Sequence, residues 1–243
     1  MKRALSAAIA AGLVLLTIGV GVVFLSLGKI VKTAVEAAGP RVLGAPVELG
    51  LVTISPWSGR GTLRGLVIGN PAGFKSAHAA SVASVEVEVR LRSLLTNTIV
   101  VERVAVREPE LIWEIGPGGS NLKKLQGNAE ASAAKYGGSM GSAPAPEATS
   151  VKKGKSLLIQ DFIVTGGKVG LAATALGGGG LSGPLPDVHL TNIGGEGRSP
   201  ADAAAQAFRA VTNSAQGAVS NIGGKTLDQV RSALSSFFKR NGK

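Results

Sequence analysis

A long uncharged segment near the N-terminus constrains this chain more than any other feature. Lys2 and Arg3 precede a run from Ala4 to Gly28 without a charged side chain, and Lys29 and Lys32 follow it. As a helix rising about 1.5 Å per residue, this run spans roughly 37 Å, more than a hydrocarbon core of about 30 Å. A cleaved signal peptide is the alternative, but its apolar core usually runs only about 7 to 15 residues. The sequence therefore predicts a transmembrane helix.

The composition narrows the chemistry that the rest of the chain can perform. Cysteine is absent, which excludes disulfides, thiolate zinc sites and cysteine nucleophiles. Aromatic residues make up 4% of the chain, so its core is expected to consist mainly of aliphatic side chains in a sheet. The net charge of +11 lies mostly in segments 120–156 and 198–243, where basic and aromatic residues do not alternate in a repeated pattern that would provide stacking platforms. This pattern does not predict nucleic-acid binding.

Strict alternation of apolar and polar residues after Pro46 predicts a β-sheet with one dry and one wet side. The clearest case is the segment from Val85 to Arg92, in which four apolar residues alternate with four charged ones. Further strands are expected at 47–53, 61–69, 98–106 and 110–115, with a corner at Glu108-Pro109, and at 156–164, 168–173 and 187–191. The candidate apolar groove face comprises Val85, Val87, Val89, Leu91, Ile99, Val101, Leu111 and Trp113.

One strand–corner–strand unit occurs twice. A shift of 58 residues places Val100–Val106 over Leu158–Val164, and the same shift places Leu111 and Trp113 over Val169 and Leu171. Repeats of this kind stack edge to edge, which predicts a longer sheet.

Helical patterns occupy the remaining segments. The first helix is expected to continue as a stalk and to end or bend at Gly39-Pro40, and Ser120 is expected to cap a helix over 121–136. Segment 137–154 has the composition of a flexible linker. A C-terminal pair of helices over 200–222 and 226–240 is expected to break at Gly223-Gly224, and its second part carries an amphipathic stripe of Leu227, Val230, Leu234, Phe237 and Phe238. Docking of this stripe on the sheet is the first expectation.

Five segments follow from these patterns. They are a transmembrane helix and stalk (1–40), a β-sheet module with a closing helix (41–136), a linker (137–154), a second short β module (155–197) and C-terminal amphipathic helices (198–243).

The order of short motifs along the chain resembles the bacterial AsmA-like family. The segment Gly44–Leu49 is similar to its opening strand, Leu66–Phe74 to its Gly-Asn-Pro segment, and Ser93-Leu94-Leu95 to its Ser-Leu-Leu element. The strand pair over Val101–Trp113 and the segment Gly119–Leu122 are similar to the family's Pro-x-Leu and Gly-x-Asn elements. The resemblance implies a groove-forming sheet like that of bridge-like lipid-transfer proteins, a cytoplasmic N-terminus and a periplasmic bulk. About eight strands at about 4.8 Å each give a groove under roughly 40 Å, too short to bridge two membranes alone.

The sequence shows no catalytic or metal-binding pattern. His78 and His189 lie far apart with no carboxylate at ligand spacing, so surface histidines are expected. The Gly177–Gly180 run lacks the residues of a phosphate loop, and Asp161 and Asp187 are expected to be solvated acids rather than a catalytic pair. The loop from Asn70 to Phe74 fits a turn better than a binding loop.

The combined prediction is a membrane-anchored α+β protein with a curved, mostly antiparallel sheet, a groove-like apolar face and amphipathic C-terminal helices. It is a non-enzymatic, single-pass protein of the bacterial inner membrane without cofactors, whose apolar face serves lipid handling or membrane homeostasis. An anchored scaffold that recruits other envelope proteins through its sheet edge and terminal helix is the alternative. The expected partners are the lipid bilayer, and as open alternatives phospholipid acyl chains, other envelope proteins or a second copy. Burial of the apolar face under protein or under lipid gives the same pattern.

Overall fold

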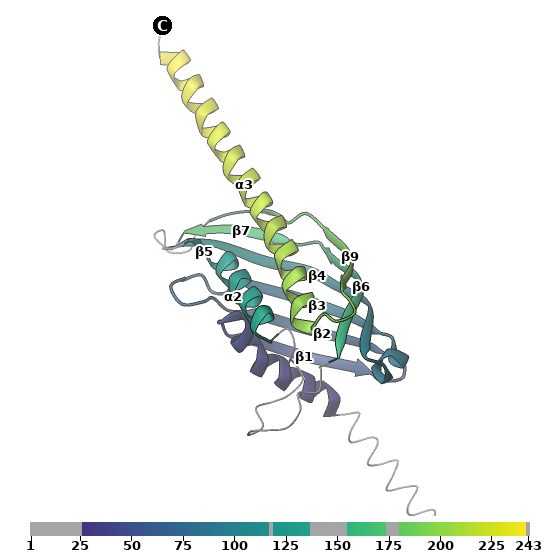
Figure 1. The fold of residues 1–243 in the computed structure, drawn as a ribbon. Helices are drawn as coiled ribbons and strands as arrows, with labels where there is room; N and C mark the ends of the chain where they lie inside the picture. The colour runs from purple at the N-terminus through teal and green to yellow at the C-terminus, as the bar shows by residue number, and fades with distance from the viewer. Residues whose placement is uncertain (1–25, 117–118, 137–154, 174–179, 242–243) are drawn as a thin grey trace, which may run out of the picture.

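A computed structural model describes residues 26–116, 119–136, 155–173 and 180–241 of the 243-residue chain (Figure 1). A helix over residues 26–43 precedes the first strands. The strands are β1 (Val47–Ser55), β2 (Arg60–Ile68), β3 (Ala80–Val89), β4 (Thr98–Gly116), β5 (Gly119–Ser120), β6 (Ser156–Thr165), β7 (Lys168–Ala173), β8 (Gly180–Pro184) and β9 (Val188–Gly194). The helices are the 3₁₀ turn η1 (Leu91–Leu95), α2 (Asn121–Tyr136) and α3 (Pro200–Asn241).

All nine of these strands join one sheet, ordered β1-β2-β3-β4-β6-β9. Strand β4 is the longest and pairs with β3 on one side and with both β6 and β7 on the other, while β8 continues the sheet beyond β7. The pairs β4–β6 and β4–β7 are parallel and the others antiparallel. The fold is therefore α+β with a mostly antiparallel sheet, and the two predicted strand regions form one continuous layer.

The internal repeat determines how the two strand regions pair. Val100 pairs with Leu158 and Val106 with Val164, and further along Leu111 pairs with Val169. Every one of these pairs is separated by 58 residues, the shift at which the sequence repeats. The predicted edge-to-edge stacking of the repeats is confirmed, because like residues of the two copies lie side by side in parallel strands.

The corner of each repeat is marked by a residue in left-handed backbone conformation, which lies inside a continuous strand in the first copy and between two strands in the second. Glu108 has φ 50° within the continuous strand β4, and Gly166 has φ 68° between β6 and β7. The prediction of two strands separated at Glu108-Pro109 is wrong, because Pro109 pairs with Val82 and β4 runs through. Gly65, with φ 65°, occupies the corresponding place in β2. At this line the side chains that face the helices change from one alternating set to the other. Along β1, Val47 and Leu49 are buried before the line, whereas Leu51, the next residue of the same set, is exposed beyond it.

Helices cover one side of the sheet (Figure 1). Helix α2 packs on β4 and on α3, and the first part of α3 packs on β6 to β9. The predicted buried side of α2 is confirmed, since Leu122, Leu125 and Ala129 are all buried. Ser199 and Asp202 form the predicted start of α3, in which the Asp202 amide donates to Ser199 Oγ (3.2 Å) and the Ser199 amide donates to Asp202 Oδ2 (2.9 Å).

The helix over residues 26–43 lies along the edge strand β1 instead of standing apart as a stalk. Lys32 Nζ donates to the carbonyl of Gly50 (3.1 Å) and Glu36 Oε1 accepts from the amide of Leu49 (3.0 Å), so these side chains bind backbone groups of the edge strand. The helix continues through Gly39-Pro40, where it was expected to end or bend. At Gly39 a Cβ atom would lie 2.6 Å from Val47 Cγ2, so glycine permits the close approach of helix and strand.

Three predictions about helices require correction. In the ranges that the structure describes, no helix is long and apolar enough to cross a membrane, which overturns the membrane-anchored fold class and the single-pass inner-membrane localisation. Residues 1–25 of the expected transmembrane helix lie outside the described residues, as do the expected linker 137–154 and residues 174–179. The expected break at Gly223-Gly224 is also absent, because glycine costs about 1 kcal/mol of helix propensity but keeps its backbone hydrogen bonds. The C-terminal part of α3 projects beyond the sheet instead of docking on it (Figure 1).

Candidate functional site

The residues of the predicted apolar face divide into a buried group and a half-buried group. Val101, Leu111 and Trp113 lie in the core under the helices. The half-buried group comprises Val85, Val87, Val89 and Ile99, and Leu91 lies in η1 with 38% of its surface exposed. The structure thus assigns the first group to packing within the protein and leaves the second group partly accessible.

The accessible part of the face, which we call the distal apolar patch, consists of Leu63, Val85, Val87, Val89 and Val104. Leu63 pairs with Val85 across β2 and β3, and Val87 pairs with Val104 across β3 and β4. All five are half-buried, whereas α2 and α3 pack mainly on β4 and the strands beyond it. The patch therefore lies where helix coverage is thinnest.

Gly61 lies within the distal apolar patch and leaves a gap in it. It pairs with Val87 on β3 and with Ile54 on β1. A Cβ atom at Gly61 would meet no atom closer than 3.8 Å, so the gap has room for a side chain. Gly61 was not among the residues predicted from the sequence, because a glycine in a strand contributes nothing to an alternating pattern.

The opposite side of the sheet is polar and carries ladders of ion pairs. Arg60 Nε lies 3.1 Å from Glu88 Oε1, and Arg107 donates from Nε and Nη2 to the two carboxylate oxygens of Glu86 at 3.0 and 3.2 Å. The Arg107 hydrogen bond lowers the pKa of Glu86, although the slight burial of the carboxylate opposes this shift. The predicted alternation of a dry and a wet side is therefore confirmed at β3.

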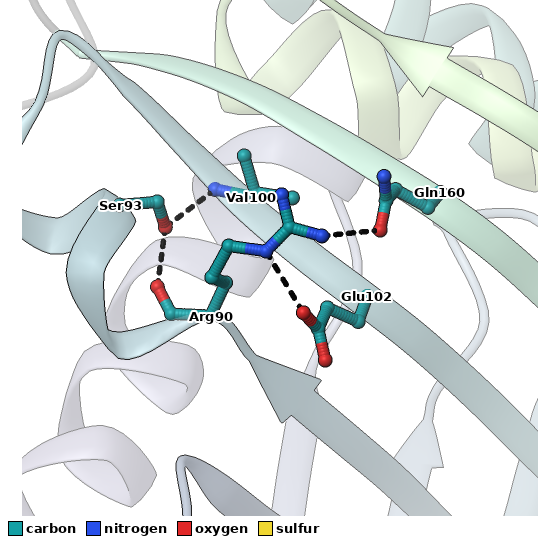
Figure 2. A network of polar contacts seen from close by, with 5 residues as sticks. All are labelled: Arg90, Ser93, Val100, Glu102 and Gln160. Atoms are coloured by element: carbon teal, nitrogen blue, oxygen red, sulfur yellow. Dashed lines mark hydrogen bonds and ion pairs between the residues drawn. The ribbon is translucent and has the colours of Figure 1, made fainter.

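A polar network fixes the turn between β3 and β4 (Figure 2). Ser93 Oγ donates to the carbonyl of Arg90 (2.6 Å) and accepts from the amide of Val100 (2.9 Å). The Arg90 guanidinium donates to Glu102 Oε1 (2.8 Å) and Gln160 Oε1 (3.2 Å), which joins β3, β4 and β6. The buried Ser93 thus explains the serine of the Ser-Leu-Leu element, because its hydroxyl shapes η1.

A second polar network connects the loop over residues 70–76, which we call the Asn-Pro loop, to the start of α2. The amide group of Asn121 accepts from the backbone amide of Glu114 (2.9 Å) and donates to the carbonyl of Ile112 (2.8 Å), as a neighbouring strand would. It also donates to Asn70 Oδ1 (2.8 Å), and Asn70 in turn donates to the carbonyl of Ser76 (2.7 Å). This loop is a structural turn, as its sequence indicates.

The fully buried Glu114 is the anchor of this loop. Its carboxylate accepts from the backbone amides of Lys75 (2.9 Å) and Ser76 (2.7 Å) and from Ser76 Oγ (2.7 Å). Strand alternation places Glu114 opposite Trp113 on the wet side, so no sequence pattern signals its burial.

The titratable residues outside these networks do not converge. His189 Nε2 lies 3.2 Å from Asp161 Oδ1 with both side chains exposed, and Asp187 accepts instead from the amide of Gly166 (3.3 Å). His78 Nε2 is buried without a hydrogen-bond partner. Across the ranges placed by the structure, no group of three or more His, Cys, Asp or Glu residues is arranged to hold a metal ion.

The predicted C-terminal stripe lies on the described helix α3, but the side chains of residues 225–241 lie outside the described part of the chain. Its role therefore stays a prediction.

Comparison with known proteins gives one match. The model of the AsmA family matches residues 1–178, which include the distal apolar patch, η1 and both polar networks. No curated protein and no solved structure gives a match.

Proposed function

The chain belongs to the AsmA family and is an envelope-associated protein, and we propose that it handles lipid by binding acyl chains on the distal apolar patch. The proposal requires no enzymatic step and no cofactor. A non-polar chain needs an accessible apolar surface, and its affinity grows with the area removed from water.

The observation that carries the proposal is the incomplete burial of Val85, Val87 and Val89. Their neighbours Val101 and Trp113, on the same side of the sheet, are buried by the helices. Valines on β3 remain half-buried and adjoin the gap at Gly61. An apolar strip of this kind gains free energy when an acyl chain replaces water on it.

Site-specific photocrosslinking in the full chain tests the proposal. Benzoylphenylalanine at Val87 points to the patch, and the same residue at its neighbour Glu86 points to the polar side and serves as the control. After irradiation in cell membranes, mass spectrometry is expected to find lipid adducts at position 87 and several-fold fewer at position 86. Equal yields at both positions, or no lipid adduct at position 87, would refute the proposal.

A blocking substitution sharpens this experiment. Gly61→Leu fills the gap opposite Val87 without a close backbone contact. We expect this variant to keep its fold and to lower the adduct yield at position 87 several-fold.

A scaffold function is the second candidate. It is favoured by the projection of α3 beyond the sheet (Figure 1). Recruitment through the β1 edge has less support, because Lys32 and Glu36 already bind backbone groups there. A single protein adduct from benzoylphenylalanine at Phe237, retained in the Gly61→Leu variant, would favour the scaffold over lipid handling.

A further inference from the structure

The end of the sheet at which β1 turns into β2 and β3 turns into β4 presents large apolar side chains to solvent. We call this surface the tip and define it by Trp57, Leu91, Leu94 and Leu95. Their exposed fractions are 80%, 38%, 43% and 92%. Both turns lie together, because a Cβ atom at Gly59 would approach Leu91 Cγ and Cδ2 at 3.3 Å and the Val89 amide donates to the Gly59 carbonyl (2.8 Å).

The tip has a fixed shape despite its exposure. Ser93 is buried and binds backbone groups on both sides of η1, and Thr96 Oγ1 donates to the carbonyl of Ser93 (2.9 Å) or of Thr98 (2.8 Å). Lys155 Nζ donates to the carbonyl of Leu94. The side chains of Ser93 and Lys155 thus fix a turn whose leucines are exposed. These leucines add no buried apolar surface to the core.

Cations surround the tip. Arg60, Arg90, Arg92 and Lys155 lie at this end and are all exposed. Arg60 is paired with Glu88 and Arg90 with Glu102, so Arg92 and Lys155 supply the excess positive charge. Glu196 and Arg198, beside the start of β6, add one charge of each sign. Cations around exposed leucines and a tryptophan fit the interface of an anionic bilayer, where Trp lies at the headgroup level.

The chain preceding Ser26 also leaves the described part at this end. Gly28 lies over Val52 and Gly39 over Val47, so the helix over 26–43 runs antiparallel to β1 with its first turn toward the tip. Residues 4–25 of the sequence carry no charged side chain. The uncharged stretch of sequence therefore joins the described chain at this end of the sheet.

We propose that the tip docks on the surface of an anionic phospholipid bilayer, with Trp57, Leu94 and Leu95 entering the interface and the surrounding cations contacting phosphate groups. In this position the distal apolar patch opens beside the membrane, since Val89 is separated from Leu91 by a single residue. The inference goes beyond the proposed acyl-chain binding and does not depend on it.

Single-cysteine labelling of the full chain tests the docking, because the protein has no cysteine of its own. Leu95→Cys places a nitrobenzoxadiazole label at the tip. Leu181→Cys is the matched control, since Leu181 is also an exposed leucine but lies on β8 beside Leu171, toward the opposite end of the sheet. Both proteins are reconstituted in vesicles of phosphatidylcholine with and without about 30% phosphatidylglycerol, each with and without dibrominated lipid.

Lipid-borne bromine is expected to quench the label at position 95 at least threefold more than the label at position 181, and more strongly with phosphatidylglycerol present. Arg92→Glu is expected to remove most of the additional quenching that phosphatidylglycerol causes. Since Arg92 is exposed, this variant is expected to keep the fold, which far-UV circular dichroism reports.

Three results would overturn the inference. They are equal quenching at both positions, a label at position 95 that emits as in water, and a label at position 95 that emits as in an apolar medium but resists lipid-borne bromine. The last result would indicate that another protein, a second copy or residues 1–25 cover the tip. None of these results depends on the lipid adducts at Val87, so failure of the docking and failure of the proposed function remain distinguishable.

Discussion

Replacing Glu108 with glycine is predicted to stabilise the protein. Glu108 has φ 50° in the middle of β4, a conformation that costs an ordinary L-residue roughly 1–2 kcal/mol. The second copy of the repeat has Gly166 at the same position with φ 68°. The chain therefore contains both a strained and a relaxed form of one structural unit.

The magnitude follows from two opposing contributions. Relief of the left-handed conformation favours glycine by about 1–2 kcal/mol, and the additional entropy of the unfolded glycine opposes it by about 0.5–1 kcal/mol. Glu108→Gly should therefore raise the free energy of unfolding by about 0–1.5 kcal/mol. The reverse change, Gly166→Ala, should lower it by about 1–2 kcal/mol. A Cβ atom at Gly166 would lie 3.6 Å from Glu108 Cγ, an ordinary contact, so backbone conformation alone carries this cost.

Urea unfolding of the full chain, followed by the emission of the buried Trp113, measures both changes. Glu110→Gly is the matched control, because Glu110 is an exposed glutamate two residues further along β4 with no positive φ. The control should destabilise by about 0.5–1 kcal/mol. If Glu108→Gly destabilises as much as Glu110→Gly does, the assignment of strain to Glu108 is wrong.

Three further predictions concern the two polar networks and the contact of Glu130 on α2 with Arg209 on α3. Glu114→Gln should lower the free energy of unfolding by about 1–3 kcal/mol, because its amide cannot accept every donor of the Asn-Pro loop; a loss below about 0.5 kcal/mol in urea unfolding would contradict the anchoring role. Ser93→Ala should cost about 1–2 kcal/mol by leaving the Val100 amide without its acceptor, and faster hydrogen exchange of that amide would report the loss; unchanged exchange would count against it. Hydrogen bonds from Gln126 and Arg209 lower the pKa of Glu130 below the ordinary value of 4.5. These bonds therefore stabilise the folded protein at a pH above 4.5, and their contribution is lost as the pH falls through the lowered pKa. The free energies of unfolding of the wild type and of Glu130→Gln are compared by urea unfolding at about pH 7 and about pH 3. Because the pair is partly exposed, the stability advantage of the wild type should shrink by only about 0.5 kcal/mol on acidification. An advantage that grows on acidification would contradict the lowered pKa.

Local patterns in the sequence determined much of the fold. The alternation at Val85–Val89 predicted a strand with two unlike sides, since residues of a strand point alternately to opposite faces. The capping residues Ser120 and Ser199 predicted the starts of α2 and α3. The 58-residue repeat predicted that its copies stack edge to edge in one longer sheet, and the pairing of β4 with β6 confirms this.

The order of short motifs along the chain was sufficient to indicate the AsmA family. Three of these motifs have a physical explanation in the fold. Asn70 and Asn121 hydrogen-bond to each other across 51 residues, and Ser93 shapes the turn that presents Leu94 and Leu95.

Only the tertiary structure decided which part of the apolar side is covered. Val89 and Trp113 satisfy the same alternating pattern, yet the helices bury Trp113 and leave Val89 half-buried, because coverage depends on where α2 and α3 lie. Glu114 is buried because a loop 38 residues away supplies its hydrogen-bond donors. Alternation in the sequence shows which residues lie on the same face of a sheet. Whether that face is buried depends on distant segments that pack against it.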